Sequence, residues 1–125
     1  MSAADAEAVL ARIVPTADVA ELSHCDLVIE AVFEDLAVKQ SVLKETEAKL
    51  SPTAIFATNT STIPITKIAA ASARPERVIG MHFFSPVHKM PLLEVIVTPK
   101  TAPEVTAAVV EFGRPLGIVS VRDAL

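Results

Sequence analysis

This sequence of 125 residues has few cysteine, glycine and aromatic residues. Its single cysteine, Cys25, cannot form a disulfide within the chain, and we expect it to be a small buried hydrophobic residue rather than a redox centre. None of the three glycines belongs to a Gly-x-Gly-x-x-Gly turn, the motif that lays a dinucleotide pyrophosphate on a helix N-terminus. The acidic residue expected about 20 residues after such a turn is missing too.

Charge and hydropathy exclude several classes of partner. Lys and Arg total 11 against 15 Asp and Glu, which gives a net charge of −4 with no basic run and argues against nucleic acid or an anionic membrane. No uncharged apolar stretch approaches about 18–20 residues, and no signal-peptide pattern opens the chain. The sequence therefore indicates a cytoplasmic protein, and we predict no metal site in it.

The apolar residues that are present predict an α/β fold of one domain. The chain is 51% hydrophobic, with a mean hydropathy of +0.48 supplied mainly by Ala, Val, Ile and Leu, as a parallel sheet buried on both faces requires. The expected helices cover residues 3–11, 36–50, 64–71 and 103–112, and the expected strands cover residues 12–16, 26–32, 54–57, 78–84, 92–98 and 118–122. The sheet should be mainly parallel at first, with a hairpin after Phe84 that makes its last part antiparallel.

A hydroxyl, an imidazole and a carboxylate lie at the ends of successive apolar runs, at Ser61, His82 and Glu94. The strand ends of an α/β sheet are where ligands bind. A symmetric antiparallel pairing across residues 85–91 would place His82 opposite Glu94, at a Cβ separation of about 4.5–5.5 Å. A His oriented by a Glu is a ready general base. The alternative is a His and a Glu that flank a turn by chance, and spacing alone does not decide between the two.

Several motifs in one order also carry a family resemblance, from about Arg12 to Asp123. They are Asp26-Leu27-Val28-Ile29-Glu30-Ala31-Val32-Phe33-Glu34-Asp35, Lys39, Ala57-Thr58-Asn59-Thr60-Ser61-Thr62, Gly80-Met81-His82-Phe83-Phe84-Ser85-Pro86 and Met90-Pro91-Leu92-Leu93-Glu94-Val95-Ile96. Together they resemble the later part of the NAD-binding domain of L-3-hydroxyacyl-CoA dehydrogenases. The residues of these motifs are most similar to those of the multifunctional alpha subunits of fatty-acid oxidation complexes.

The resemblance implies that residues 1–125 are a partial, incomplete Rossmann-like NAD-binding domain. It implies that the first strand–helix–strand unit and the C-terminal helical domain of the family are missing, so that the fragment alone would be inactive. The ending Asp123-Ala124-Leu125 departs from the Asp-Gly-Pro-Gly-Phe usual in the family, and we interpret Ala124-Leu125 as vector sequence.

The resemblance also implies an activity, which is the oxidation of L-3-hydroxyacyl-CoA to 3-ketoacyl-CoA with NAD in fatty-acid beta-oxidation. His82 matches the family's base, Glu94 the carboxylate that orients it, and Ser61 a residue that hydrogen-bonds the substrate oxygen beside the nicotinamide. The resemblance further implies that the residues in contact with the cofactor are Val32, Phe33, Glu34, Lys39, Ser61 and Ser85. Ser85 stands where many relatives have Asn, and without the family Glu34 and Lys39 would be plain surface charges.

From the residues, we expect Asn59-Thr60-Ser61-Thr62 to cap the helix that begins at Pro64. Capping and ligand binding would then share that segment.

Two alternatives to this dehydrogenase stay open. The first is a non-catalytic Rossmann-like fragment that serves only folding or association. The second is another Rossmann dehydrogenase, of the 2-hydroxy-acid or 6-phosphogluconate type, which the His82–Glu94 spacing disfavours. The sequence does not give the acyl chain length or any further activity of the parent, such as enoyl-CoA hydratase.

The predicted strand order leaves one strand unpaired. The family match makes Arg12–Thr16 the third strand and Asp26–Val32 the fourth of the order 3-2-1-4-5-6, with the strands between them missing. We therefore expect a homodimer through the strand at residues 27–32 or through residues 1–20. In the parent, the resemblance implies acyl-CoA as substrate and a thiolase beta subunit as partner.

Overall fold

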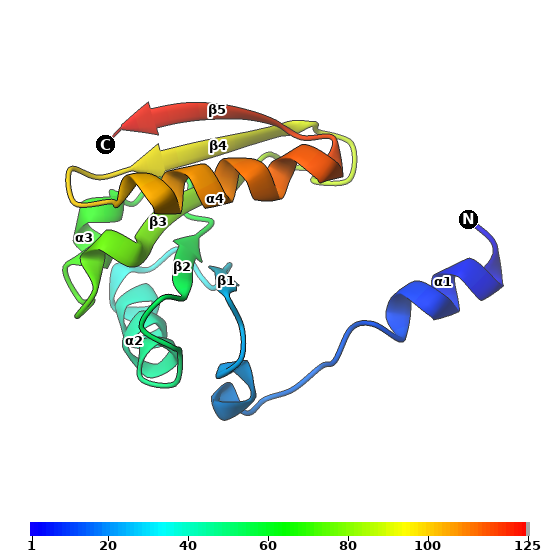
Figure 1. Cartoon of the computed structure of the whole chain (residues 1–125), viewed down its shortest axis with the longest axis horizontal. Coiled ribbons are helices and arrows are strands. Elements are labelled where there is room, and N and C mark those ends of the chain that lie inside the picture. Colours follow the sequence, from blue (N-terminus) through cyan, green and yellow to red (C-terminus); the bar gives the residue numbers. More distant parts are fainter. Residues whose placement is uncertain (125) are drawn as a thin grey trace.

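The computed structural model describes residues 1–124, which form a five-stranded sheet with helices on both of its faces (Figure 1). The α-helices are α1 (Ala3–Leu10), α2 (Leu36–Glu47), α3 (Ile65–Ala69) and α4 (Pro103–Gly113). The strands are β1 (Leu27–Glu30), β2 (Ile55–Thr58), β3 (Val78–Phe83), β4 (Leu92–Val97) and β5 (Val119–Ala124). Short 3-10 helices cover Val19–Leu22, Pro75–Arg77 and Arg114–Leu116. Leu125, which was interpreted together with Ala124 as vector sequence, lies outside the described residues.

The strands lie in the order β1-β2-β3-β4-β5. The pairs β1–β2, β2–β3 and β4–β5 are parallel, and β3–β4 is antiparallel. The predicted mainly parallel sheet with an antiparallel turn after Phe84 is therefore confirmed. The carboxyl ends of the first three strands lie at one edge, where the amino end of β4 joins them.

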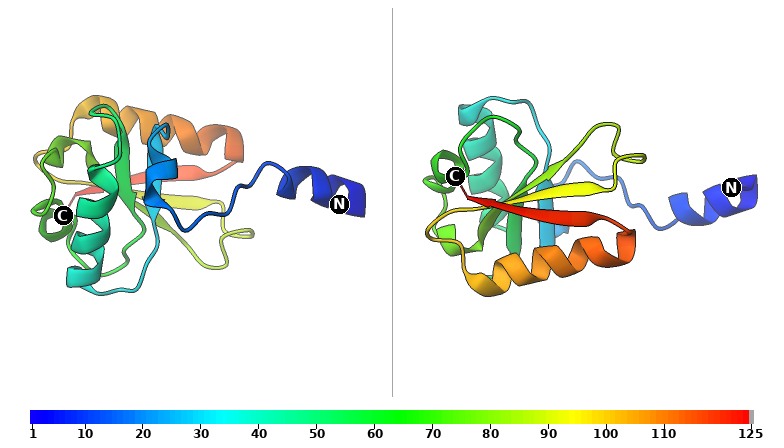
Figure 2. Two further views of the ribbon diagram at one scale, coloured as in Figure 1. Left: turned by 90° about the horizontal axis from the view of Figure 1, so that it is seen from below. Right: turned by 90° about the horizontal axis from the view of Figure 1, so that it is seen from above.

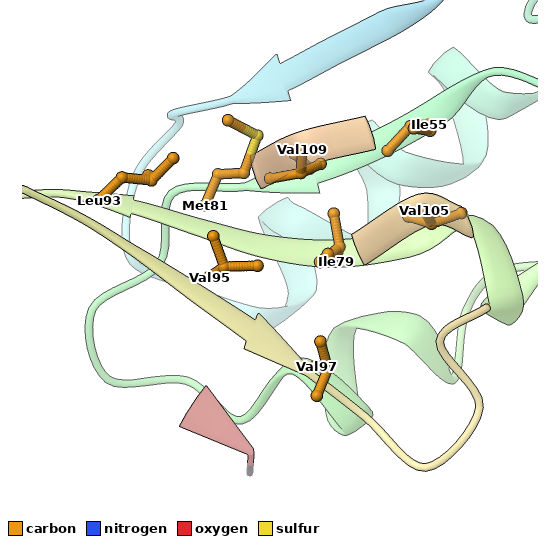
Figure 3. Packing of buried hydrophobic residues seen from close by; sticks show 9 residues of the cluster. Ile55, Ile79, Met81, Leu93, Val95, Val97, Val105 and Val109 are labelled. Atoms are coloured by element: carbon orange, nitrogen blue, oxygen red, sulfur yellow. The ribbon is translucent and has the colours of Figure 1, made fainter. Parts of the chain in front are cut away.

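One face of the sheet packs on α4, and the other packs on α2 and α3 (Figure 2). Side chains alternate between these faces along each strand, as the pleat requires. The α4 face gathers nine buried residues between helix and sheet (Figure 3): Ile55, Ala57, Ile79, Met81, Leu93, Val95, Val97, Val105 and Val109. The opposite face gathers Leu43, Phe56, Ile65, Ala69, Val78 and Ile96. Because helices cover both faces, the central strands β2 and β3 are mainly apolar and mainly buried.

The N-terminal arm differs from its prediction. The helix expected at residues 3–11 forms as α1, Ala3–Leu10, and a capping box of Ser2 and Asp5 stabilises its start. Residues 12–16 were expected to be a strand, but they are exposed and form no ladder in the described structure. Pro15 cannot donate to a ladder, and no strand lies beside this stretch. Figure 1 shows α1 projecting away from the sheet at the end of an extended linker.

Two local predictions are wrong as well. Pro64 was placed in the first turn of α3, but it is the N-cap, in extended backbone, with no side-chain capping bond. The segment at residues 59–62 therefore does not cap α3, and its hydroxyls are used elsewhere. Cys25 is half-buried rather than buried, and it precedes β1, an edge strand of the sheet.

Gly80 of β3 leaves room for the side chains of Ile65 from α3 and Ile96 from β4. A Cβ at this position would lie 2.8 Å from Ile96 Cβ and 2.9 Å from Ile65 Cδ1. We predict that Gly80→Ala overpacks this contact and lowers the free energy of unfolding by about 1–3 kcal/mol. Gly113→Ala is the control, since its Cβ would meet only ordinary contacts from 3.4 Å and its backbone is already helical. Urea unfolding of both variants measures the difference, and equal stabilities would contradict this account of the packing.

Candidate active site

The candidate site lies at the edge where β1, β2 and β3 end and β4 begins. In this sheet the parallel strands bring their carboxyl ends together, so the loops that follow them are neighbours. Residues 31–35 follow β1, residues 59–64 follow β2, and the turn at residues 84–91 joins β3 to β4. All the site residues expected from the sequence belong to these segments, to the adjoining strand ends or, for Lys39, to α2.

His82 and Glu94 face each other across the antiparallel β3–β4 pair. Their register is the one that the spacing predicted, with His82 opposite Glu94. His82 Nδ1 lies 3.1 Å from Glu94 Oε1, and the two side chains are 20% and 28% exposed. The imidazole also contacts the Phe84 ring, with centroids 4.7 Å apart. A carboxylate only accepts hydrogen bonds, so Nδ1 carries the proton in the neutral ring and Nε2 is left as an acceptor.

Glu34 binds the loop that follows β2. Its carboxylate accepts hydrogen bonds from Ser61 N at 2.8 Å, Ser61 Oγ at 3.0 Å, Thr60 Oγ1 at 2.8 Å and Thr62 N at 3.3 Å. Lys39 Nζ lies 3.5 Å from the same carboxylate. Burial raises the pKa of Glu34, but the hydrogen bonds from Ser61, Thr60 and Thr62 outweigh it and lower the pKa from 4.5 to about 2.

A buried ion pair lies beneath this loop. Lys39 Nζ donates to Glu30 Oε2 at 2.6 Å and to Val32 O at 3.3 Å. Glu30 accepts further hydrogen bonds from Val32 N at 3.0 Å and Thr58 Oγ1 at 2.7 Å. The side chains of Lys39 and Glu30 are 2% and 0% exposed, so Lys39 is not the surface charge that its sequence context alone suggested. Its ammonium is occupied by acceptors of its own chain.

The structure thus links Glu34, Lys39 and Ser61 in one network and pairs His82 with Glu94 in another. Val32 and Phe33 lie beside the first network, 38% and 85% exposed. The exposed Ser85 follows His82 by three residues and belongs to the turn after β3.

Two residues of this edge were missed by sequence reasoning. Glu30 is a charge inside an apolar run, and that contrast was a usable signal for a buried partner such as Lys39. Asn59 accepts a hydrogen bond from Phe83 N through its Oδ1 at 2.9 Å, and nothing in its local sequence pointed to that contact.

Comparison with known proteins places the chain in a family. The model of the 3-hydroxyacyl-CoA dehydrogenase NAD-binding domain matches residues 1–123. The chain belongs to that family. NAD is the cofactor of the family, and the fold is that of Rossmann-type dehydrogenases.

Individual relatives agree with this family. The chain is 47% identical over 117 residues to the fatty acid oxidation complex subunit alpha of Shewanella amazonensis, which covers 94% of the chain and 17% of that subunit. The crystal structure of FadB2 from M. tuberculosis superposes with a TM-score of 0.96 at 40% identity, over 99% of this chain and 44% of FadB2. The 3-hydroxybutyryl-CoA dehydrogenase of Escherichia coli gives a TM-score of 0.94 at 40% identity, over 99% of this chain and 26% of that one.

The residues of this dehydrogenase-family domain fit one part of NAD. Val32 and Phe33 offer an exposed apolar surface that a ring can cover, and the exposed hydroxyls of Ser61 and Ser85 can bind polar groups. A pyrophosphate needs a cradle of backbone N–H groups, and the chain contains no Gly-x-Gly-x-x-Gly turn to supply it. The nicotinamide half therefore fits this edge better than the phosphates do.

Residues 1–124 contain no group of three or more His, Cys, Asp or Glu side chains placed to hold a metal ion. No helix within that range is both long and apolar enough to cross a membrane.

The low pKa of Glu34 predicts an acid-sensitive part of the stability. The folded protein keeps Glu34 ionised down to about pH 2, whereas the unfolded chain takes up the proton near its ordinary pKa of 4.5. This contribution is therefore complete above pH 4.5 and is lost as the pH falls towards 2. Between pH 4.5 and 2, the free energy of unfolding of Glu34→Gln should fall less than that of the wild type. Urea unfolding at a series of pH values measures both. Glu45→Gln, an exposed change on α2, should follow the wild type.

The buried ion pair predicts a large cost for removing one partner. Lys39→Met leaves the Glu30 carboxylate buried without its counter-ion and should lower the free energy of unfolding by about 3–5 kcal/mol. Arg114→Met is the matched control, because its ion pair with Glu111 has side chains 71% and 64% exposed. Breaking an exposed pair of that kind costs about 0–1 kcal/mol. Similar losses in the two variants would show that the Lys39 pair is effectively solvated.

Proposed function

We propose that this chain supplies the acid–base residues of an NAD-dependent 3-hydroxyacyl-CoA dehydrogenase of fatty-acid beta-oxidation. The substrate would be an L-3-hydroxyacyl-CoA and the product the 3-ketoacyl-CoA. The observation that carries the proposal is the 3.1 Å contact between His82 Nδ1 and Glu94 Oε1, at the edge where β3 ends and β4 begins in a dehydrogenase-family sheet. The names of relatives, which are subunits of fatty acid oxidation complexes and a 3-hydroxybutyryl-CoA dehydrogenase, support the substrate class.

In this mechanism His82 is the general base. Its Nε2 accepts the proton of the substrate's C3 hydroxyl, while Glu94 keeps Nδ1 protonated and stabilises the imidazolium that forms. When bound, NAD would supply the acceptor for the hydride that leaves C3. A positioned acid–base pair of this kind accounts for about 10²–10⁴-fold in rate.

The other residues of the edge bind and orient in this proposal. Ser61 would bind the substrate oxygen beside the nicotinamide, and Val32, Phe33 and Ser85 would contact the cofactor. Glu34 and Lys39 would contribute through the loop that carries Ser61, because Glu34 binds that loop and Lys39 lies 3.5 Å from the Glu34 carboxylate. The name of the Shewanella relative supports a parent enzyme that assembles with another subunit, for which we propose a thiolase.

The test uses a chimera in which residues 1–123 replace the matching segment of the Shewanella amazonensis alpha subunit. His82→Gln and Glu94→Gln should each lower kcat by about 10²-fold or more, because they remove the base or its orienting carboxylate. Neither change should alter the Kd of NAD more than about twofold, since the pair holds a proton rather than the cofactor. Steady-state kinetics and calorimetric titration measure the two quantities.

His88→Gln is the control, because His88 lies exposed in the turn between β3 and β4. An active chimera whose turnover survives His82→Gln would end the catalytic proposal and leave the non-catalytic reading.

A second function, association between copies of the chain, is favoured by the exposure of β1. This strand pairs only with β2 among the described residues, and Ile29 is 38% exposed on it. An edge strand with unpaired N–H and C=O groups templates pairing with another chain. We propose that the isolated chain forms a homodimer through β1.

Ile29→Lys should convert the proposed dimer into a monomer, because a charge on the edge opposes strand pairing. Val119→Lys is the matched control on β5, the opposite edge strand, where Val119 is 63% exposed. Light scattering of the chain and its two variants measures the mass. A wild-type monomer would refute the dimer. A dimer that only Val119→Lys dissociates would show that the contact is on β5 and not on β1.

A further inference from the structure

The ladder between β2 and β3 ends before it reaches His82. The last matched pair is Thr58 with Gly80, whereas β3 continues to Phe83. His82 is therefore paired with Glu94 of β4 on one side and lies beyond the β2 register on the other. Beyond Gly80, β3 has ladder partners on its β4 side only.

The side chain of Asn59 holds β3 at this point. Its Oδ1 accepts a hydrogen bond from Phe83 N at 2.9 Å, directly after His82. Its own N–H donates to Glu30 O at 2.8 Å, so Asn59 joins the ends of β1 and β3. Asn59 is half-buried, and its amide oxygen takes the place of the carbonyl that a longer β2 would offer.

The position of Phe83 N decides the position of His82, because one peptide plane joins the two residues. If Phe83 N lost its acceptor, this end of β3 could move relative to the rest of the edge. Misplacement of a catalytic group by about 1 Å can cost 10²-fold in rate. The contact of Asn59 is thus well placed to keep the imidazole facing Glu94.

We propose that Asn59 is a positioning residue that holds His82 opposite Glu94 through its hydrogen bond with Phe83 N. The geometric part of this inference stands on the described contacts, and only its effect on turnover rests on the proposed function. A merely structural role would stabilise the fold without affecting which imidazole nitrogen carries the proton.

Three variants separate these roles. Asn59→Leu keeps the size of the side chain without the acceptor, and Asn59→Asp keeps an acceptor oxygen. Thr101→Val is the matched control, because Thr101 Oγ1 donates to Val78 O at 3.3 Å, at the other end of β3. If Asn59→Leu does not fold, Asn59→Ala carries the same test with a smaller side chain.

The first measurement is ¹⁵N NMR of the neutral His82 ring in the 125-residue chain. The wild type should carry its proton on Nδ1, facing Glu94. Asn59→Leu should give a mixture of the two tautomers, while Asn59→Asp and Thr101→Val should keep the wild-type form. A wild-type tautomer in Asn59→Leu would overturn the inference.

The second measurement is turnover of the chimera. Asn59→Leu should lower kcat by about 10–100-fold with the Kd of NAD unchanged, whereas Asn59→Asp should recover most of the loss. Equal kcat values for Asn59→Leu and Thr101→Val, at equal losses of stability, would reduce Asn59 to a structural role. A changed tautomer in Asn59→Leu, together with full turnover of His82→Gln, would instead refute the proposed function and leave the positioning intact.

Discussion

A buried carboxylate, Glu30, holds the ends of β1 and β2 together, and the geometry of the edge depends on it. It accepts from Lys39 Nζ and from Thr58 Oγ1, so one acidic group joins α2, β1 and β2. Such a pair is costly to desolvate, and only the further hydrogen bonds to its oxygens make the burial tolerable. Lys39 also lies 3.5 Å from Glu34, which extends the network to the loop with Ser61.

Side-chain hydrogen bonds of this kind recur along the edge, where a side chain of one segment binds the end of a neighbouring strand or the loop after it. Glu34 holds the loop after β2, Asn59 holds the end of β3, and Glu94 of β4 faces His82. Loops at strand ends have few backbone partners, so side-chain bonds must give them a defined shape. For the proposed dehydrogenase, the benefit would be a base that needs no rearrangement before it accepts a proton.

Much of this structure could be predicted from the sequence. Apolar runs broken by turn residues located the five strands of the sheet, and a symmetric pairing across residues 85–91 placed His82 opposite Glu94, as observed. These features depend on periodicity and on turn length, which are local properties. The strand expected at residues 12–16 did not form because a strand requires a neighbour, and the described residues offer none there.

Two contacts between residues far apart in the sequence were not predicted. Lys39 looks like a surface charge on an amphipathic helix, and only its tertiary contact with Glu30 makes it a buried counter-ion. The capping expected of residues 59–62 failed for a related reason, since the hydroxyls of Thr60 and Ser61 donate to Glu34 instead. Competition among partners far apart in the sequence decided both cases.

The central claim is that His82 is held by Glu94 so that its Nε2 faces the hydroxyl of the substrate. A crystal structure of the chimera with a 3-hydroxyacyl-CoA bound tests this directly. The account predicts the C3 hydroxyl oxygen within about 2.6–3.2 Å of His82 Nε2, with Nδ1 still on Glu94. A hydroxyl bound away from His82, or an imidazole turned so that Nε2 faces Glu94, would contradict it.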